Sequence, residues 1–131
     1  MKCETSLKDG LDKINERKRP GMVIIHQSTC SVCTSLQPKF LASVDINRLN
    51  PLFVFISLQD GAEPKDKKWI PDGRYYPRIF FLNLKGEIML DITNNGENRT
   101  YKYYYANEAN LVRSMERVLD IYPEPRGVKR R

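Results

Sequence analysis

Three short apolar runs limit the folds that are open to this chain. They span residues 22–25 (MVII), 52–58 (LFVFISL) and 78–84 (RIFFLNL). Each run is too short for a core helix and is rich in β-branched or aromatic residues, which is typical of strands buried on both faces. A fourth run, residues 87–92, follows Lys85-Gly86 and predicts an antiparallel hairpin with the third run. The core is therefore expected to form around a β-sheet.

Helical patterns lie between and after these runs. Pro38 falls inside the second pattern and predicts a kink, while Asn107 is expected to cap the third. The polar stretch 59–76 is long for a simple connection and predicts a short helix around Trp69. The apolar residues at helical spacing are Leu7, Leu11 and Ile14 in the first pattern, Cys33, Leu36, Phe40 and Val44 in the second, and Leu111, Met115, Val118 and Leu119 in the third.

The order of these elements predicts an α/β fold. Two strands separated by a helix favour a parallel crossover, and the hairpin adds antiparallel strands at one side. We therefore expect a central mixed β-sheet with helices on both faces. In such sheets the functional site lies beyond the carboxyl ends of the parallel strands, which is where Cys30 follows residues 22–25.

Length and charge predict one domain over residues 5–122, with tails at 1–4 and 123–131. The net charge is +6, yet residues 21–123 hold twelve basic and eleven acidic side chains. A nucleic-acid binder carries its basic residues on the folded surface, so we expect no nucleic-acid partner. We also expect no membrane partner, because no stretch approaches the ~20 apolar residues of a span. Charged residues near the start argue against a signal peptide, and we find no retention motif.

Cys30 and Cys33 are three residues apart, just after a predicted strand and on the first turn of a predicted helix. A thiolate is the nucleophile in disulfide exchange, and a helix N-terminus stabilises it through unpaired N–H groups and the helix dipole. Cys30 at the cap is expected to be exposed, whereas Cys33, one turn further, faces the protein. This geometry predicts that Cys30 attacks and Cys33 resolves.

Two alternatives for the pair stay open. A structural disulfide across three residues closes a very small loop and removes little chain entropy. A zinc site needs four ligands, whereas His26, Cys30 and Cys33 supply at most three, which leaves an open zinc site or a cluster shared between subunits. We expect no metal and no organic cofactor. His26 is expected to pack near the site and to influence the cysteine pKa, and Cys3 is expected to be a bystander.

With the pair placed between a strand and a proline-containing helix, the chain resembles the thioredoxin superfamily. More narrowly, it resembles the small single-domain thioredoxin-like proteins of the endoplasmic reticulum that are related to the anterior-gradient proteins. The motifs that carry this resemblance are MVIIH at 22–26, CxxC at 30–33, LxPKF at 36–40, EPKD at 63–66, PDGRYYPRIFFL at 71–82 and YKYYY at 101–105.

The resemblance implies a thioredoxin fold and a thiol–disulfide oxidoreductase that supports protein folding in the secretory pathway. The implied location is the lumen of the endoplasmic reticulum. Its implied partners are proteins with disulfides or thiols, together with glutathione or another redox partner. Pro77 matches the cis-proline of the superfamily, which would place the Tyr76 backbone beside Cys30, where an extended substrate segment can pair.

The chain also departs from the family pattern. Thr29 and Ser31 stand where strongly active members carry Trp and Gly, and Ser31-Val32 is the dipeptide that tunes the reduction potential. Ile24 stands where thioredoxins keep a buried acid, so release of a mixed disulfide is expected to be slow. The alternative function is therefore a weakly catalytic or non-catalytic thioredoxin-fold protein that binds clients or partners.

Overall fold

The computed structural model describes residues 3–123; in the helix after Cys30 it describes the side chains of Cys33 and of residues from Gln37 onward. In this part of the chain no helix is long and apolar enough to cross a membrane. In chain order the helices and strands are α1 (Leu7–Arg17), β1 (Gly21–His26), α2 (Ser31–Ala42), α3 (Val44–Leu49), β2 (Val54–Gln59), β3 (Arg78–Leu82) and α4 (Glu108–Ile121), with single 3₁₀ turns at Asn50–Leu52, Asp60–Ala62 and Lys67–Trp69.

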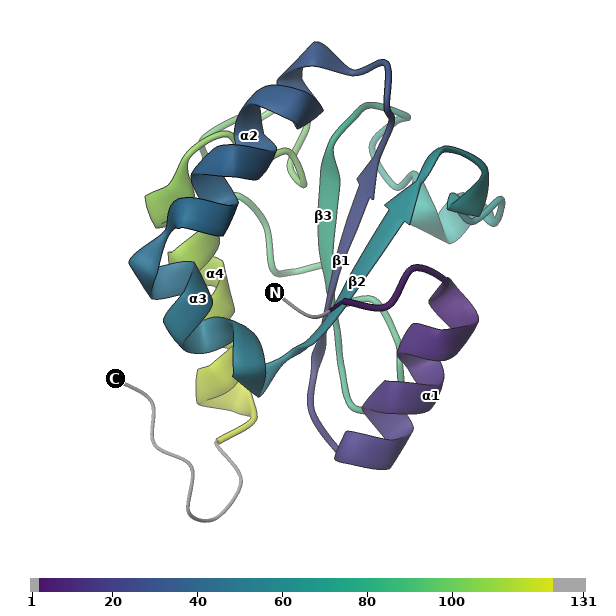
Figure 1. Ribbon diagram of the computed structural model, residues 1–131, viewed down its shortest axis with the longest axis vertical. Coiled ribbons are helices and arrows are strands. Elements are labelled where there is room, and N and C mark those ends of the chain that lie inside the picture. The colour runs from purple at the N-terminus through teal and green to yellow at the C-terminus, as the bar shows by residue number, and fades with distance from the viewer. Residues whose placement is uncertain (1–2, 124–131) are drawn as a thin grey trace.

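The three strands form a mixed sheet in the order β2-β1-β3. β1 is the central strand; it pairs in parallel with β2 and antiparallel with β3. Helix α1 lies on one side of the sheet, and α2, α3 and α4 lie on the other (Figure 1). The predicted α/β fold, with helices on both faces of a mixed sheet, is confirmed.

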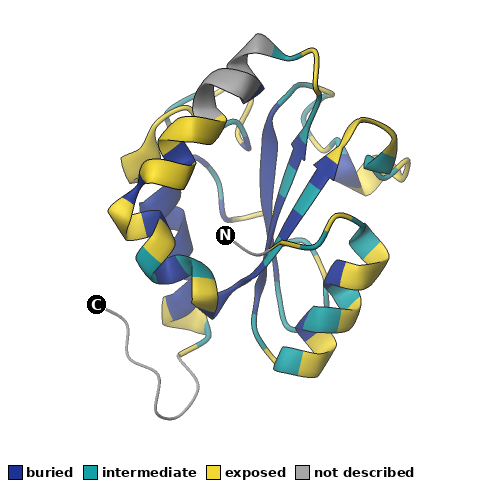
Figure 2. Ribbon diagram, in the orientation of Figure 1, coloured by how far each residue is buried: buried dark blue, intermediate teal, exposed yellow. Residues whose placement is uncertain are grey.

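Side chains alternate along β1 between two separate cores. Met22 and Ile24 pack with the residues of α3 and α4, whereas Val23 and Ile25 pack in the cluster that contains Ile14 of α1. A strand with both faces covered reads as a continuous apolar run because neither face meets water. The strands are accordingly mostly buried, and the exposed residues lie on the outer sides of the helices (Figure 2).

The predicted fourth strand, over residues 87–92, is wrong. Only Ile88 pairs with β3, in an isolated antiparallel bridge to Leu82, and Met89 donates a hydrogen bond to Phe81. The chain then turns, since the amide of Ile92 donates to the carbonyl of Met89. This turn ends the pairing after one bridge, so the hairpin contributes a single strand to the sheet.

The second helical pattern is divided in two. Helix α2 runs through Pro38 to Ala42, and Ser43 then caps α3 by accepting a hydrogen bond from the amide of Ile46. The prediction that Val44 continues the apolar face of α2 is wrong. Val44 is 80% exposed at the start of α3, while Ile46 is 1% exposed and packs in the core.

Other local predictions are confirmed. Asn107 caps α4 by accepting from the amides of Ala109 and Asn110. Trp69 ends a short 3₁₀ turn and is buried against the edge of Phe80.

Glu4, predicted to lie in the N-terminal tail, forms a parallel bridge with Ile56 of β2. The domain limits at 5 and 122 stay predictions, and most of the two predicted tails lies outside the described residues.

Candidate active site

Cys30 is the N-cap of α2, at the carboxyl end of β1. Its sulfur accepts a hydrogen bond from the amide of Cys33 over 3.1 Å. Cys30 is half-buried, whereas Cys33 is 8% exposed. Neither sulfur takes part in a disulfide. The more accessible thiol is therefore the one that contacts the N-terminus of the helix.

A distant segment completes the surroundings of Cys30. The sulfur of Cys30 lies 3.6 Å from the carbonyl oxygen of Tyr76 and donates its thiol hydrogen to it. The peptide bond between Tyr76 and Pro77 is cis. The fold thus brings Cys30, Cys33, Tyr76 and Pro77 together, although Tyr76 is far along the chain from the cysteines. The side chains of Ser31 and Val32 lie outside the described residues.

Cys33 has an environment that disfavours its thiolate. Burial and the contact with Cys30 raise the pKa of Cys33 to about 12. The part of this pKa increase that comes from Cys30 requires the Cys30 sulfur to be a thiol or thiolate. It is therefore lost once Cys30 forms a disulfide with another sulfur. The contribution of burial remains. At neutral pH Cys33 is therefore held as a thiol in the dithiol form of the protein.

Cys33 lines a cavity of 420 Å³. His26 and Ser57 form a polar pair in its wall, with 2.7 Å between the histidine Nε2 and the serine Oγ. Burial lowers the pKa of His26, against the opposing charge of Asp60, so the imidazole is neutral at neutral pH. Ile24 also lines the cavity. His26 thus shares this cavity with Cys33, and its role at the site stays a prediction.

Sequence reasoning missed a polar network on the other side of Tyr76. Arg78 is fully buried and forms an ion pair with Glu63, with 2.5 Å between Nη2 and Oε2. The hydroxyl of Tyr76 donates to the same carboxylate. The signal was present in the sequence, because a charged residue opens the apolar run RIFFL, and a buried arginine needs an acidic partner.

The site is a dithiol with a neighbouring backbone acceptor. Among the described residues, no three His, Cys, Asp or Glu side chains are grouped so that they could hold a metal ion. Two thiols one helical turn apart can pass two electrons to a disulfide, and the disulfide they then form can take two electrons from a dithiol, without any bound group.

Comparison with known proteins agrees with this geometry. A family model described as thioredoxin-like matches residues 2–83. The chain is 33% identical to the human "Anterior gradient protein 2 homolog" over 86% of its own length and 63% of that protein. It is 32% identical to "Anterior gradient protein 3" of Xenopus tropicalis over 86% of this chain and 68% of that protein. The chain therefore spans a little under two thirds of the human relative's length.

The thioredoxin-like match covers α1, β1, α2, α3, β2 and β3, so it includes the whole sheet and the cysteine pair. The match to the anterior gradient proteins covers most of the chain. This chain belongs to the thioredoxin-like family and is a relative of the anterior gradient proteins.

Proposed function

We propose that this protein is a thiol–disulfide oxidoreductase that acts on protein disulfides and dithiols through Cys30 and Cys33. The observation that carries the proposal is the position of the Cys30 sulfur, which accepts the Cys33 amide at the start of α2 and contacts the Tyr76 carbonyl. An amide donor at a helix N-terminus stabilises a thiolate, and Cys30 as a residue is only half-buried.

The proposed reduction runs in two exchange steps. The thiolate of Cys30 attacks one sulfur of a substrate disulfide, which forms a mixed disulfide and releases the other substrate sulfur as a thiolate. The thiolate of Cys33 then attacks the Cys30 sulfur and releases the second substrate sulfur. The substrate gains two electrons and two protons, and Cys30 and Cys33 become a disulfide. The same steps in reverse oxidise a substrate dithiol.

The second step requires a proton to leave Cys33. Burial opposes this, since it holds the pKa of Cys33 high. Of the described side chains that line the shared cavity, His26 is the one that is a base at neutral pH. A cavity of this size can hold water, and we propose that the proton of Cys33 leaves through it.

The cellular setting is proposed from family resemblance. We place the protein in the lumen of the endoplasmic reticulum, within the secretory pathway, where it supports the folding of proteins that contain disulfides. Glutathione or another dithiol is the proposed redox partner, because the cysteine pair must be returned to its starting state after each turnover.

A second function is favoured by the wall of the cavity. Ile24 lines the cavity, and none of the described residues in the cavity wall carries a carboxylate. Cys33 is held as a thiol. If the second exchange step is slow, the protein retains its client as a mixed disulfide or binds it without exchange. In this case it is a client-binding protein with weak catalysis.

Substitution of each cysteine separates the two functions. We expect Cys30→Ser to abolish the reduction of insulin disulfides, and Cys33→Ser to accumulate mixed disulfides with client proteins, since it removes the resolving sulfur. The measurements are insulin turbidity and non-reducing electrophoresis. Insulin reduction by Cys30→Ser at the wild-type rate would exclude the proposed role of Cys30. Equal client capture by the doubly substituted protein would favour the binding function.

A further inference from the structure

Arg78 is a charged residue in a fully buried position. It opens β3 and is 0% exposed, in a strand whose other residues are all apolar and buried. Removal of a guanidinium from water is costly, and a well-packed apolar residue in such a position is often at least as stable. Stability alone therefore gives a weak reason for an arginine here.

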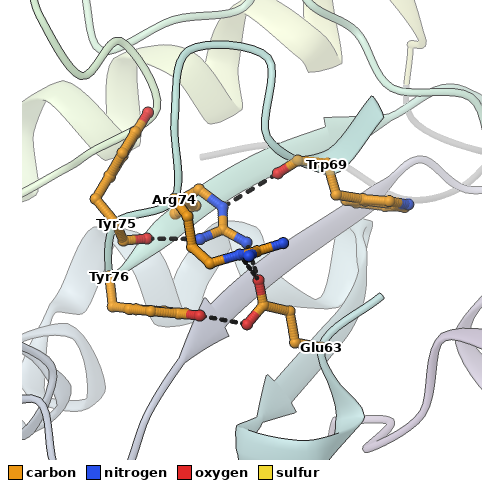
Figure 3. A network of polar contacts seen from close by, with 6 residues as sticks. Glu63, Trp69, Arg74, Tyr75 and Tyr76 are labelled. Carbon is orange, nitrogen blue, oxygen red and sulfur yellow. Dashed lines mark hydrogen bonds and ion pairs between the residues drawn. The ribbon is translucent and has the colours of Figure 1, made fainter. Parts of the chain in front are cut away.

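The contacts of Arg78 connect three separate points of one loop. Its Nε donates to the carbonyl of Trp69 over 3.1 Å, and its Nη1 donates to the carbonyl of Tyr75 over 2.8 Å. Its Nη2 pairs with Glu63. The guanidinium carbon lies 5.0 Å from the centre of the Tyr76 ring. Figure 3 shows Glu63, Trp69, Tyr75 and Tyr76 gathered around this network of polar contacts.

Glu63 holds the side chain of Tyr76 in turn. One carboxylate oxygen accepts the Tyr76 hydroxyl, and the other accepts Arg78 and lies 3.4 Å from the Nε of Arg74. Burial favours the neutral acid, but the hydrogen bonds from Tyr76 and Arg78 lower the pKa of Glu63 below its ordinary value. The carboxylate is therefore ionised at neutral pH and keeps both contacts.

These contacts restrict the backbone that leads to the Tyr76 carbonyl. The carbonyl of Tyr75 is bound by Arg78, and the next carbonyl, that of Tyr76, contacts the Cys30 sulfur. Because peptide groups are planar, Arg78 on the Tyr75 carbonyl orients the whole peptide group between Tyr75 and Tyr76, and Glu63 on the hydroxyl holds the Tyr76 side chain. Rotation about the Cα–C bond of Tyr76 is then the backbone freedom left to its carbonyl. The network thus holds a backbone acceptor beside the sulfur of Cys30.

We propose that Glu63 and Arg78 are positioning residues that hold the Tyr76 backbone for pairing with an extended polypeptide substrate at Cys30. This inference rests on the proposed oxidoreductase function, takes its polypeptide substrates as given, and assigns two further residues to that site. A small disulfide without a backbone needs only the sulfur of Cys30. The two kinds of substrate should therefore respond differently when the network is broken.

The test compares Arg78→Lys with the wild type on two substrates. Lysine keeps the positive charge but loses the planar fork that reaches Trp69, Tyr75 and Glu63 together. One substrate is a pair of short linear peptides joined by one disulfide, and the other is bis(hydroxyethyl) disulfide. We expect kcat/KM for the peptide to fall about tenfold, mainly through KM, and the rate with the small disulfide to stay within about twofold of wild type.

Three controls separate positioning from loss of the fold. Tyr76→Phe removes only the hydroxyl that donates to Glu63. It should give the same selective loss of kcat/KM on the peptide substrate, and it replaces Arg78→Lys as the test if that variant fails to fold. Glu97→Gln alters another carboxylate that holds a loop, through the amides of Ala106 and Asn107, and should affect both substrates equally. A peptide substrate N-methylated beside its cysteine should abolish the difference between wild type and Arg78→Lys.

The outcomes distinguish this inference from the proposed function. Equal losses on both substrates, or no loss on either, in both Arg78→Lys and Tyr76→Phe would overturn the positioning role. If the wild type reduces neither substrate faster than Cys30→Ser does, the oxidoreductase function itself fails. Selective loss on the peptide in either variant supports both proposals.

Discussion

At the scale of single residues, the two cysteines of one helical turn have opposite environments. Cys30 caps the helix, accepts an amide hydrogen and is half-buried. Cys33 lies in the wall of a cavity and has its pKa raised to about 12 by burial and by Cys30. A three-residue step is enough for this, because it turns the second side chain from the helix end toward the sheet.

Cys33 should make the reduced protein less stable at alkaline pH. A cysteine in an unfolded chain ionises near pH ~8.5. The folded pKa is about 12, above that value, so the stabilising effect is complete below pH ~8.5 and is lost as the pH rises toward 12. In this interval one proton changes the free energy of unfolding by up to about 1.4 kcal/mol per pH unit.

Urea unfolding in reducing buffer at several alkaline pH values checks this effect. Tyr75 and Tyr105 also have pKa values raised by burial, so they too change the free energy of unfolding at alkaline pH. The slope of this free energy against pH in the wild type must therefore be compared with the slope in Cys33→Ala. We expect Cys33→Ala to lose less stability than wild type as the pH rises, and Cys3→Ala, which removes an exposed thiol, to follow the wild type. Identical slopes for wild type and Cys33→Ala would contradict the assignment.

At the scale of elements, the break between α2 and α3 decides which apolar residues reach the core. Ser43 has an extended backbone and caps α3, so the helical phase starts again at Val44. The new phase directs Ile46 into the core and leaves Val44 exposed. A hydrophobic pattern read through residue 44 as one helix therefore assigns that residue to the wrong side.

Two substitutions on α3 test this phase. Ile46→Ala removes a core side chain that is 1% exposed, and it should lower the free energy of unfolding by about 2–5 kcal/mol. Val44→Ala changes an exposed side chain on the same helix and should stay within about 0.5 kcal/mol of wild type. Denaturant unfolding measures both. A loss for Val44→Ala as large as that for Ile46→Ala would mean that α3 packs in another phase.

At the scale of the whole molecule, close approach between layers holds α1 on the sheet. Gly10 lies in α1, and a Cβ at this position would lie 2.3 Å from Cδ1 and 2.5 Å from Cγ1 of Ile56 in β2. Ile56 is itself fully buried, so it has little room to move. The absence of a side chain at residue 10 therefore sets the distance between this helix and the sheet.

Gly10→Ala should reverse the usual effect of alanine in a helix. Alanine is favoured over glycine by about 1 kcal/mol in a helix interior, but the overlap with Ile56 is expected to produce a net loss of about 1–3 kcal/mol. Gly61→Ala is the control, because a Cβ at residue 61 would have no atom within 4 Å, and it should be neutral or slightly stabilising. Thermal or urea unfolding gives both values, and a stabilised Gly10→Ala protein would refute the close packing.

The sequence alone was enough to predict what depends on neighbours along the chain. The run 22–25 forms the central strand because both its faces are apolar. Cys30 caps α2 by accepting the amide of Cys33, and Asn107 caps α4 by accepting the amides of Ala109 and Asn110. The three-residue spacing of the cysteines then places one thiol at the helix end and the other inside.

Only the tertiary structure decided which distant segments meet. Glu63 meets Arg78, and the hydroxyl of Tyr76 meets the same carboxylate, although neither contact follows from local spacing. The family resemblance alone implied that the Tyr76 backbone lies beside Cys30, and the contact itself is a property of the folded chain. The absence of the predicted fourth strand also depends on the tertiary structure, because the chain turns after Ile88 and its pairing with β3 ends there. The physical reason is that burial, and the pairing a buried charge requires, belong to the packed assembly of segments and not to any one of them.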